Sequence, residues 1–185
     1  MLKLIKKIIK TGGATLEYPA KPLDLSADFR GKPEYNPQQC IACGACANAC
    51  PSNALTMTTA DDGNSLRWSL FLGRCIFCAR CEEVCPTAAI KLSQQFELAV
   101  WRKEDLFETA DFAVCHCQQC GQPYAPQKEI DFALALLQEN QGLSAQEMEN
   151  HRRQYETCPA CKQQQHLTPA SRINIGRHLT SGSRL

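Results

Sequence analysis

Residues 40–51 read CIACGACANACP, and residues 75–86 read CIFCARCEEVCP. The two stretches share one cysteine spacing, and in each the last cysteine is followed directly by proline. The residues concerned are Cys40, Cys43, Cys46 and Cys50 with Pro51, and Cys75, Cys78, Cys81 and Cys85 with Pro86. Every cysteine of the first stretch recurs 35 residues later. The chain therefore contains an internal duplication of a four-cysteine motif.

This spacing is the run that bacterial ferredoxins use to bind [4Fe–4S] clusters, and two copies predict two clusters. Two residues between successive cysteines let the backbone wrap one cubane, so three thiolates reach it while the fourth lies beyond the loop. In two-cluster ferredoxins that fourth cysteine crosses to the other cluster. We therefore assign one cluster to Cys40, Cys43, Cys46 and Cys85, and the other to Cys75, Cys78, Cys81 and Cys50. The predicted activity is electron transfer.

Disulfides, zinc and a single structural cluster are the other uses of eight cysteines, and the pattern disfavours all three. Disulfide frameworks belong to small secreted chains. We expect no secretory signal here, because lysines interrupt the apolar residues at the N-terminus. Zinc sites favour separated C-x-x-C pairs rather than a third cysteine at the same step. A structural role does not require two interlaced motifs.

Composition narrows the function classes further. The chain has 185 residues, 13 cysteines and a net charge of +1. This charge gives no reason to expect a nucleic-acid partner, and no apolar run approaches the length of a membrane span. So many cysteines without a disulfide framework favour a reducing, anaerobic cytoplasm.

Three segments follow along the chain, and the predicted fold class is α+β. Residues 1–35 form an N-terminal helix and extension, residues 36–95 a two-cluster ferredoxin-like domain, and residues 96–185 a C-terminal extension with paired C-x-x-C knuckles. Within the second segment, apolar alternation predicts strands at residues 54–58 and 66–72. Residues 61–64 have turn composition, so the strands form a hairpin that links the two motifs.

The first ten residues predict a basic amphipathic helix. One side gathers the apolar residues Leu2, Leu4, Ile5, Ile8 and Ile9, and the other gathers Lys3, Lys6, Lys7 and Lys10. Such a helix can lie in the headgroup plane of a cytoplasmic leaflet, with its lysines near anionic lipid. Docking on a partner or on its own domain explains the pattern equally well. Ten residues anchor a protein weakly, so protein partners must reinforce any membrane contact.

The C-terminal segment contains a second kind of cysteine pattern. Two C-x-x-C knuckles, Cys117 with Cys120 and Cys158 with Cys161, outline a four-thiolate zinc site. Between them, Pro126 suits a helix start, and Ile130, Ala133, Leu134 and Leu137 form an apolar stripe. A third iron–sulfur cluster, or a site in which Cys115, His116 or His166 replaces one thiolate, remains an alternative. His151 and His178 receive no role, and for the tail at residues 173–185 a contact with a partner and disorder are both open.

Longer stretches of the chain resemble a known family. The stretches are FRGKPEYNPQQCIACGACANACPSNALT, LGRCIFCARCEEVCPTAAIKL, FELAVWRKEDL, PYAPQKEIDFALALL and the start KKIIKTGGAT. Together they resemble the ferredoxin-type subunit of the formate hydrogenlyase group of membrane-bound [NiFe] hydrogenases, the hydrogenase-3 and hydrogenase-4 type. The same subunit is similar to the two-cluster ferredoxin subunit of respiratory complex I.

The resemblance implies a place in a larger complex. The eight cluster ligands of the family match the eight cysteines assigned above, and its N-terminal segment, where the peripheral arm meets the membrane arm, corresponds to residues 1–10. Formate oxidation coupled to hydrogen evolution would take place on other subunits, so this chain would be a non-catalytic electron carrier. Implied partners are the large and small hydrogenase subunits, another iron–sulfur subunit and membrane-arm subunits. The implied location is peripheral, on the cytoplasmic side of the inner membrane.

Three other functions compete with this one. A complex I subunit would pass electrons from NADH toward quinone, but it would not be expected to need the C-terminal knuckles. A free soluble ferredoxin would not need the basic N-terminal helix or the long C-terminal segment, and it often has a strongly acidic surface. A zinc-ribbon interaction protein would leave the eight ferredoxin cysteines unused.

Overall fold

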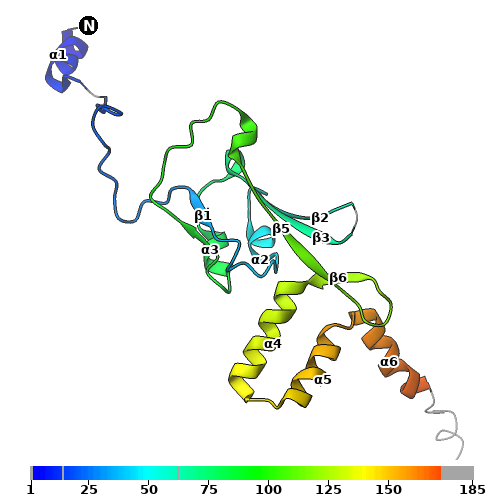
Figure 1. The fold of residues 1–185 in the computed structure, drawn as a ribbon. Coiled ribbons are helices and arrows are strands. Elements are labelled where there is room, and N and C mark those ends of the chain that lie inside the picture. Colours follow the sequence, from blue (N-terminus) through cyan, green and yellow to red (C-terminus); the bar gives the residue numbers. More distant parts are fainter. Residues whose placement is uncertain (1, 14, 62, 172–185) are drawn as a thin grey trace, which may run out of the picture.

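The computed structural model describes residues 2–13, 15–61 and 63–171, and its elements form a mixed α+β fold (Figure 1). In chain order these are α1 (Leu2–Thr11), β1 (Pro33–Tyr35), α2 (Ala45–Ala49), β2 (Leu55–Thr59), β3 (Ser65–Phe71), a 3-10 turn (Leu72–Arg74), α3 (Arg80–Val84), β4 (Ile90–Leu92), a second 3-10 turn (Lys103–Leu106), β5 (Phe107–His116), β6 (Pro123–Pro126), α4 (Gln127–Gln141), α5 (Ala145–Tyr155) and α6 (Pro159–Ser171). The predicted tail at residues 173–185, with His178, lies outside the described residues. The predicted fold class is confirmed.

The sequence duplication is also a duplication of backbone structure. The short helices α2 and α3 begin and end at positions that are 35 residues apart. Non-glycine residues with left-handed backbone, and one glycine, obey the same offset. They form the pairs Ala42 with Phe77, Gly44 with Ala79, and Asn53 with Ala88. Each cysteine loop therefore turns in the same way before and after its helix.

The strands interlock the two halves of the repeat. In one sheet, β1 pairs antiparallel with β4, and Tyr35 lies opposite Ile90. In the other sheet, β2 pairs antiparallel with β3, and Leu55 lies opposite Leu70. The second pair is the predicted hairpin, which is confirmed. Because each pair contains one strand from each half, neither cysteine loop folds independently of the other.

A compact apolar core lies between the cysteine loops. Its most deeply buried side chains are Trp68, Leu70, Ile90 and Pro33. Cysteines of both motifs pack against this core, among them Cys40, Cys46, Cys50, Cys75, Cys81 and Cys85. The sheets therefore hold the thiols of both motifs around one shared interior.

The sequence did not predict the long strand β5, which continues the sheet beyond β3. It runs antiparallel to β3 along the whole length of that strand. Arg67 and Asp111 face each other across this pair, and Arg67 Nε and Nη2 donate to the two carboxylate oxygens at 2.7 and 2.9 Å. The strand then pairs with β6, which leads into α4. In this way β5 connects the ferredoxin half to the C-terminal helices (Figure 1).

The C-terminal helices pack around a second, smaller core. Ile130 and Leu134 on α4 are buried against Cys115 at the end of β5. The predicted apolar stripe and the helix start after Pro126 are therefore confirmed. Helix α5 begins at a capping box, in which the Ser144 hydroxyl accepts from the Glu147 backbone N–H and the Glu147 carboxylate accepts from Ser144.

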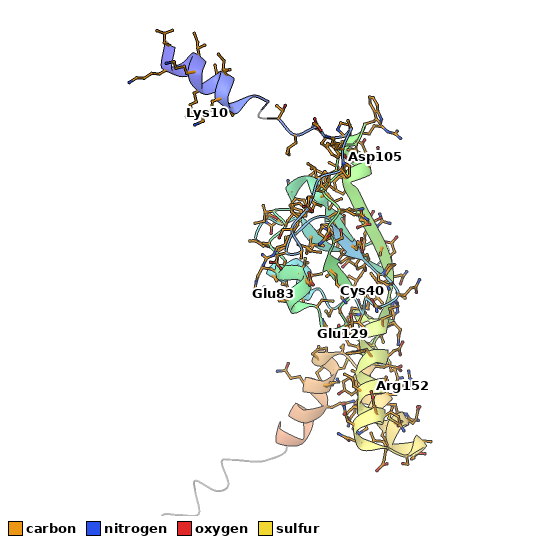
Figure 2. The ribbon with its side chains drawn as sticks, turned by 90° about the vertical axis from the view of Figure 1, so that its left-hand side faces the viewer. Lys10, Cys40, Glu83, Asp105, Glu129 and Arg152 are labelled. Atoms are coloured by element: carbon orange, nitrogen blue, oxygen red, sulfur yellow. The ribbon has the colours of Figure 1, made fainter. Side chains whose placement is uncertain are left out.

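Helix α1 lies apart from the body of the molecule at the end of an extended segment (Figures 1 and 2). None of its described residues is buried, and its large apolar side chains, Leu2, Leu4, Ile5, Ile8 and Ile9, are all at least half exposed. The predicted helix is present. None of the described helices is both long and apolar enough to cross a membrane.

Candidate iron–sulfur centres

Thiols of both motifs lie around Tyr35 as a first group, Cys40 and Cys46 from the first motif and Cys85 from the second. The pKa of the Tyr35 hydroxyl is raised by burial and then by the neighbouring Cys40, Cys46 and Cys85 thiolates. The pKa of Cys46 is raised by burial, and the charges of Cys40 and Cys43 add to that effect. Residues of both motifs therefore face one another on this side of the core.

The second group has the reciprocal composition. One cavity is lined by Cys50 of the first motif together with Cys75, Cys78 and Cys81 of the second. The rest of its lining is mainly apolar and includes Pro33, Leu55, Leu70, Ile76, Phe77 and Leu92. Burial, opposed by one N–H and reinforced by neighbouring thiolates, raises the pKa of Cys81 to about 11. Cys50, the fourth cysteine of the first motif, thus lies beside the first three cysteines of the second.

Backbone N–H groups point at the sulfurs in the same way in both halves. Ala42 N–H donates to Cys40 Sγ at 3.3 Å, and Phe77 N–H donates to Cys75 Sγ at 3.5 Å. After each helix the pattern repeats, with Ala54 N–H on Cys50 Sγ at 3.3 Å and Ala89 N–H on Cys85 Sγ at 3.2 Å. Such donors stabilise negative charge on sulfur.

These donors lower the pKa of the two cysteines that precede proline, Cys50 and Cys85. Burial alone would raise the pKa of Cys50, but hydrogen bonds from Ser52 and from backbone N–H groups outweigh it and lower that pKa. The pKa of Cys85 is lowered against burial in the same way, by the Thr87 and Ala89 backbone N–H groups. These hydrogen bonds therefore stabilise the thiolate of both cysteines relative to the thiol, and the thiolate is the form that ligates iron.

These surroundings fit iron–sulfur clusters. A cluster with four thiolates is an anionic group that needs four sulfurs, donors to those sulfurs and an enclosing apolar wall. The Tyr35 hydroxyl oxygen is buried and has no hydrogen-bond partner meeting ordinary geometry within the described part of the chain. A sulfur acceptor beside Cys40 would satisfy it. When bound, such clusters take up and release single electrons.

A third group of thiols lies in the C-terminal segment. The sulfurs of Cys117, Cys120, Cys158 and Cys161 all lie within 4.8 Å of one another. Gly121, with φ of 70°, lets the first knuckle turn sharply after Cys120. The second knuckle straddles the start of α6, where Cys158 N–H donates to Cys117 Sγ at 3.3 Å. The structure therefore brings together the two knuckles that the sequence paired.

Position in the fold distinguishes these four cysteines from Cys115 and His116. Backbone N–H donors, that of Cys158 first and that of Cys120 next, lower the pKa of Cys117 to about 6. Cys115 is instead buried in the apolar cluster with α4, and His116 Nε2 lies 3.0 Å from Asn64 Oδ1. Among the described side chains, neither belongs to the four-sulfur group. The side chain of His166 lies outside the described ones.

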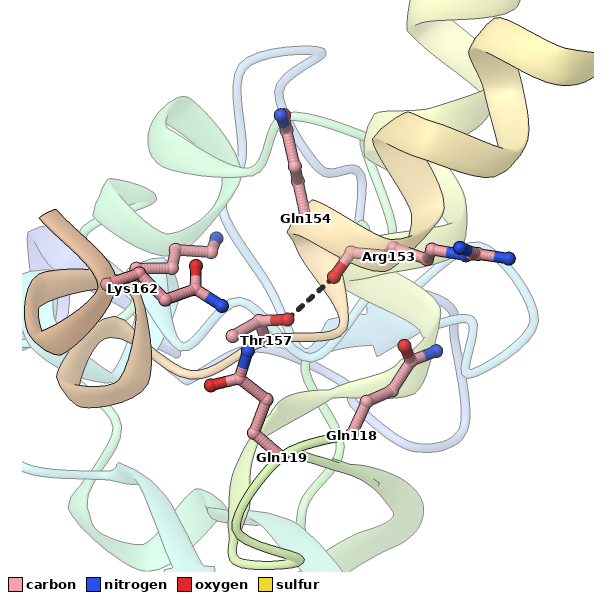
Figure 3. Close-up of a pocket in the computed structure, with 7 residues that line it drawn as sticks. Gln118, Gln119, Arg153, Gln154, Thr157 and Lys162 are labelled. Carbon is pink, nitrogen blue, oxygen red and sulfur yellow. Dashed lines mark hydrogen bonds between the residues drawn. The ribbon is translucent and has the colours of Figure 1, made fainter.

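A polar, open cavity borders the third group (Figure 3). It is lined by Gln118, Gln119, Arg153, Gln154, Thr157, Lys162 and Gln165. The Thr157 hydroxyl donates to the Arg153 carbonyl at 2.7 Å, which fixes the turn between α5 and α6. The cavity wall is therefore built by the same turn that leads into the second knuckle.

Comparison with known proteins agrees with the geometry of the first two groups. Residues 39–89 match the model of the 4Fe-4S dicluster domain. The chain is 59% identical over 179 residues to formate hydrogenlyase subunit 6 of Escherichia coli (strain K12), an alignment that covers 97% of this chain and 98% of that protein. The chain belongs to the formate hydrogenlyase subunit 6 family. The predicted resemblance is thereby confirmed.

Two further proteins are similar to part of this chain. NADH-quinone oxidoreductase subunit I of Carboxydothermus hydrogenoformans is 41% identical over 96 residues, which is 50% of this chain and 69% of that protein. A solved chain of the membrane-bound sulfane sulfur reductase, an archaeal respiratory membrane complex, has 26% identity and a TM-score of 0.41, with 56% of each chain covered. Over half of its length, the chain is thus also similar to a subunit of an NADH-quinone oxidoreductase.

Sequence reasoning missed two residues beside the first group. Trp68 was placed on a strand with no further role, and Tyr35 was given none. In the structure their rings stack, with centroids 3.7 Å apart, and Trp68 Nε1 donates to Cys46 Sγ at 3.4 Å. A comparison of the two halves at the offset of 35 could have found them, because these positions hold Pro33 and Leu70 in the other half.

Proposed function

We propose that this chain is an electron-transfer subunit of a membrane-bound formate hydrogenlyase, relaying electrons through two [4Fe–4S] clusters between formate oxidation and hydrogen evolution. The observation that carries the proposal is the pair of cysteine groups inside a dicluster domain, in a chain that is 59% identical to a formate hydrogenlyase subunit over nearly its full length. Neither reaction centre would lie on this chain, so its own contribution is to hold, shield and tune the carriers.

The ligand assignment crosses between the motifs. One cluster would take Cys40, Cys43, Cys46 and Cys85, and the other Cys75, Cys78, Cys81 and Cys50. The cavity that gathers the second set supports this assignment, as does the effect of Cys85 on Tyr35 in the first. Cys46 also contributes to the raised pKa of Cys81, so the two sets lie close to each other. Closely spaced carriers suit a relay.

The N-terminal helix would make the contact with the membrane arm. Its apolar side chains are exposed on a helix that also carries four lysines, which suits an interface that is partly lipid and partly protein. The partners would be the large and small hydrogenase subunits, another iron–sulfur subunit and membrane-arm subunits. The location would be peripheral, on the cytoplasmic side of the inner membrane.

The C-terminal cysteines would hold one structural zinc ion. Tetrahedral zinc with Zn–S bonds of about 2.3 Å separates its sulfurs by about 3.8 Å. Cys120 Sγ and Cys158 Sγ are 3.8 Å apart. Thiolates around a cubane bind four different irons and stand farther apart, so this spacing disfavours a third [4Fe–4S] cluster. The ion would fasten the end of the β5–β6 hairpin to α6.

A complex I subunit is the second candidate, favoured by the 41% identity to an NADH-quinone oxidoreductase subunit over half of this chain. The C-terminal four-cysteine group argues for the hydrogenase assignment, because a quinone-reducing subunit would not be expected to need it. A free soluble ferredoxin is a weaker candidate still, because the apolar face of α1 would remain in water.

The first experiment is metal analysis of the anaerobically purified full chain. About eight iron, eight sulfide and one zinc per chain are expected for two cubanes and one knuckle site. About twelve iron without zinc would instead place a third redox centre at the C-terminal cysteines. The complex is then tested in cells that lack their own formate hydrogenlyase subunit 6. The chain should restore hydrogen evolution from formate, and failure despite full cluster content would contradict the proposed complex.

A further inference from the structure

The two halves of the repeat differ at two buried positions next to the cysteine groups. Backbone turns, helices and the N–H donors to sulfur all recur at the offset of 35. By the same offset, Trp68 corresponds to Pro33, and Tyr35 corresponds to Leu70. All but Tyr35 rank among the most deeply buried side chains in the described part of the protein. The asymmetry is therefore internal to the core rather than a surface variation.

On the side of the first cysteine group, both positions carry polar hydrogens. The indole N–H of Trp68, whose side chain is 1% exposed, donates to Cys46 Sγ at 3.4 Å. The Tyr35 ring stacks on the indole at an interplanar angle of 11° and fixes its orientation. The Tyr35 hydroxyl is itself buried beside Cys40, and it has no partner at ordinary hydrogen-bond geometry among the described residues. Two side-chain donors thus point toward one group of thiols.

On the side of the second group, the equivalent positions offer none. Pro33 and Leu70 both line the cavity that gathers Cys50, Cys75, Cys78 and Cys81, and neither side chain can donate a hydrogen bond. Arg80 also borders this cavity, but its guanidinium pairs with Glu83 at 2.5 Å and both side chains are more than half exposed. The matched backbone donors cancel in the comparison. Beside the second group, Arg30 Nη1 donates to the Cys78 carbonyl at 3.4 Å, so its acceptor is a backbone oxygen rather than a sulfur. Trp68 and Tyr35 are therefore the side-chain donors near the sulfurs that the equivalent positions of the second group lack.

We propose that Trp68, supported by Tyr35, separates the reduction potentials of the two clusters and makes the one at Cys40, Cys43, Cys46 and Cys85 the easier to reduce. The inference rests on the proposed two-cluster function. Reduction adds one electron to an already anionic cluster, and a donor to a ligand sulfur stabilises that more negative state. An electron shared by the two clusters would therefore reside mainly on the first. Trp68 acts through Cys46 and is a tuning residue, not a catalytic one.

The test is a redox titration, followed by EPR, of the anaerobically purified full chain with both clusters in place. Trp68→Phe keeps an aromatic ring to stack on Tyr35 and removes the N–H donor together with part of the buried indole. At a fixed potential, the ratio of reduced to oxidised first cluster should fall roughly three- to tenfold, while the second stays constant. Trp101→Phe is the matched control, because Trp101 is fully exposed, and it should change neither. Tyr35→Phe should lower the first potential by less.

Pulsed EPR on protein labelled with ¹⁵N in tryptophan identifies the affected cluster without relying on a variant. One cluster signal should carry a coupling to an indole nitrogen, which Trp101→Phe keeps and Trp68→Phe removes. If Trp68→Phe fails to retain its iron, the wild-type spectrum still decides the matter, because absence of indole coupling on both clusters overturns the inference. Unchanged potentials in an iron-replete Trp68→Phe chain also overturn it and leave the two-cluster function standing. A wild-type chain without two [4Fe–4S] clusters would refute the proposed function itself.

Discussion

Gly44 and Ala79 occupy the same left-handed backbone position in the two halves of the repeat, with φ of 73° and 66°. Each lies directly before a helix, Gly44 before α2 and Ala79 before α3. A Cβ added at Gly44 would meet only the Met57 side chain, at an ordinary contact distance of 3.8 Å. The second half therefore shows that alanine can be accommodated where the first half uses glycine.

This equivalence predicts opposite effects for two reciprocal substitutions. Gly44→Ala should destabilise the domain by about 1–2 kcal/mol, because alanine pays for the left-handed conformation although no atom obstructs its Cβ. Ala79→Gly should be neutral or slightly stabilising, since the relief of that strain exceeds the added freedom of the unfolded chain. The measurement is the denaturant midpoint at which visible cluster absorbance is lost under anaerobic conditions. Loss of both clusters in Gly44→Ala before denaturant is added would contradict the prediction.

The crossing of the fourth cysteines predicts which cluster each substitution damages. Cys50→Ala should disturb the cluster held by Cys75, Cys78 and Cys81, although Cys50 belongs to the first motif. Cys85→Ala is the matched variant and should disturb the other cluster. The EPR signals of the two reduced clusters give the readout. If Cys50→Ala removes only the signal of the cluster at Cys40, Cys43 and Cys46, the crossed assignment is wrong.

Short sequence patterns predicted the structural elements that depend on residues close together in the chain. The C-P motifs and the alternation around Trp68 were enough for the cysteine loops and the hairpin. Strand β5 escaped prediction because the charged Glu108 occupies one of its inward positions and interrupts the apolar alternation. Its pairing with β3 is a tertiary contact that no short window contains. Helix α5 did carry a readable signal, the capping box of Ser144 and Glu147.

The same limit applies to the predicted site residues, because contacts between distant residues are not visible in the sequence. The cysteine spacing predicted which thiols form each group, because a cluster or a zinc knuckle sets how many residues separate successive ligands. It could not identify Trp68 as a donor to Cys46, since the two are 22 residues apart and meet only in the folded core. The absence of Cys115 from the C-terminal group likewise depends on packing against Ile130 and Leu134 rather than on sequence distance.

The C-terminal group predicts a selective loss of one metal ion. Cys120→Ser should lower zinc by about one equivalent and leave iron and sulfide unchanged, because Cys120 is one of four converging sulfurs. Cys115→Ala is the control, a neighbouring buried cysteine outside that group, and should keep its zinc. Metal analysis of both variants gives the result. A parallel fall in iron in Cys120→Ser would mean that this group holds iron.

Removal of that ion should loosen the C-terminal helices without affecting the clusters. The knuckles join the β5–β6 hairpin to α6, while Ile130 and Leu134 hold α4 in place independently. Hydrogen exchange after mild chelation should therefore rise in α6 and in the turn after α5, and should change little in α4. Equal exchange in the chelated and untreated chains would contradict a structural role for the metal.

The exposed face of α1 predicts where the chain is held in its complex. Ile5→Ser combined with Ile8→Ser removes apolar side chains that are 50% and 59% exposed, so it should not perturb the folded body. The double variant should move from the membrane fraction toward the soluble fraction, with its iron content unchanged, because it removes the apolar part of the contact that α1 makes. Lys3→Ser with Lys7→Ser is the matched control on the charged face and should weaken attachment in a salt-dependent way. If both double variants stay wholly with the membrane, the attachment lies in the body of the subunit. Helix α1 then does not have the anchoring role that its sequence predicts.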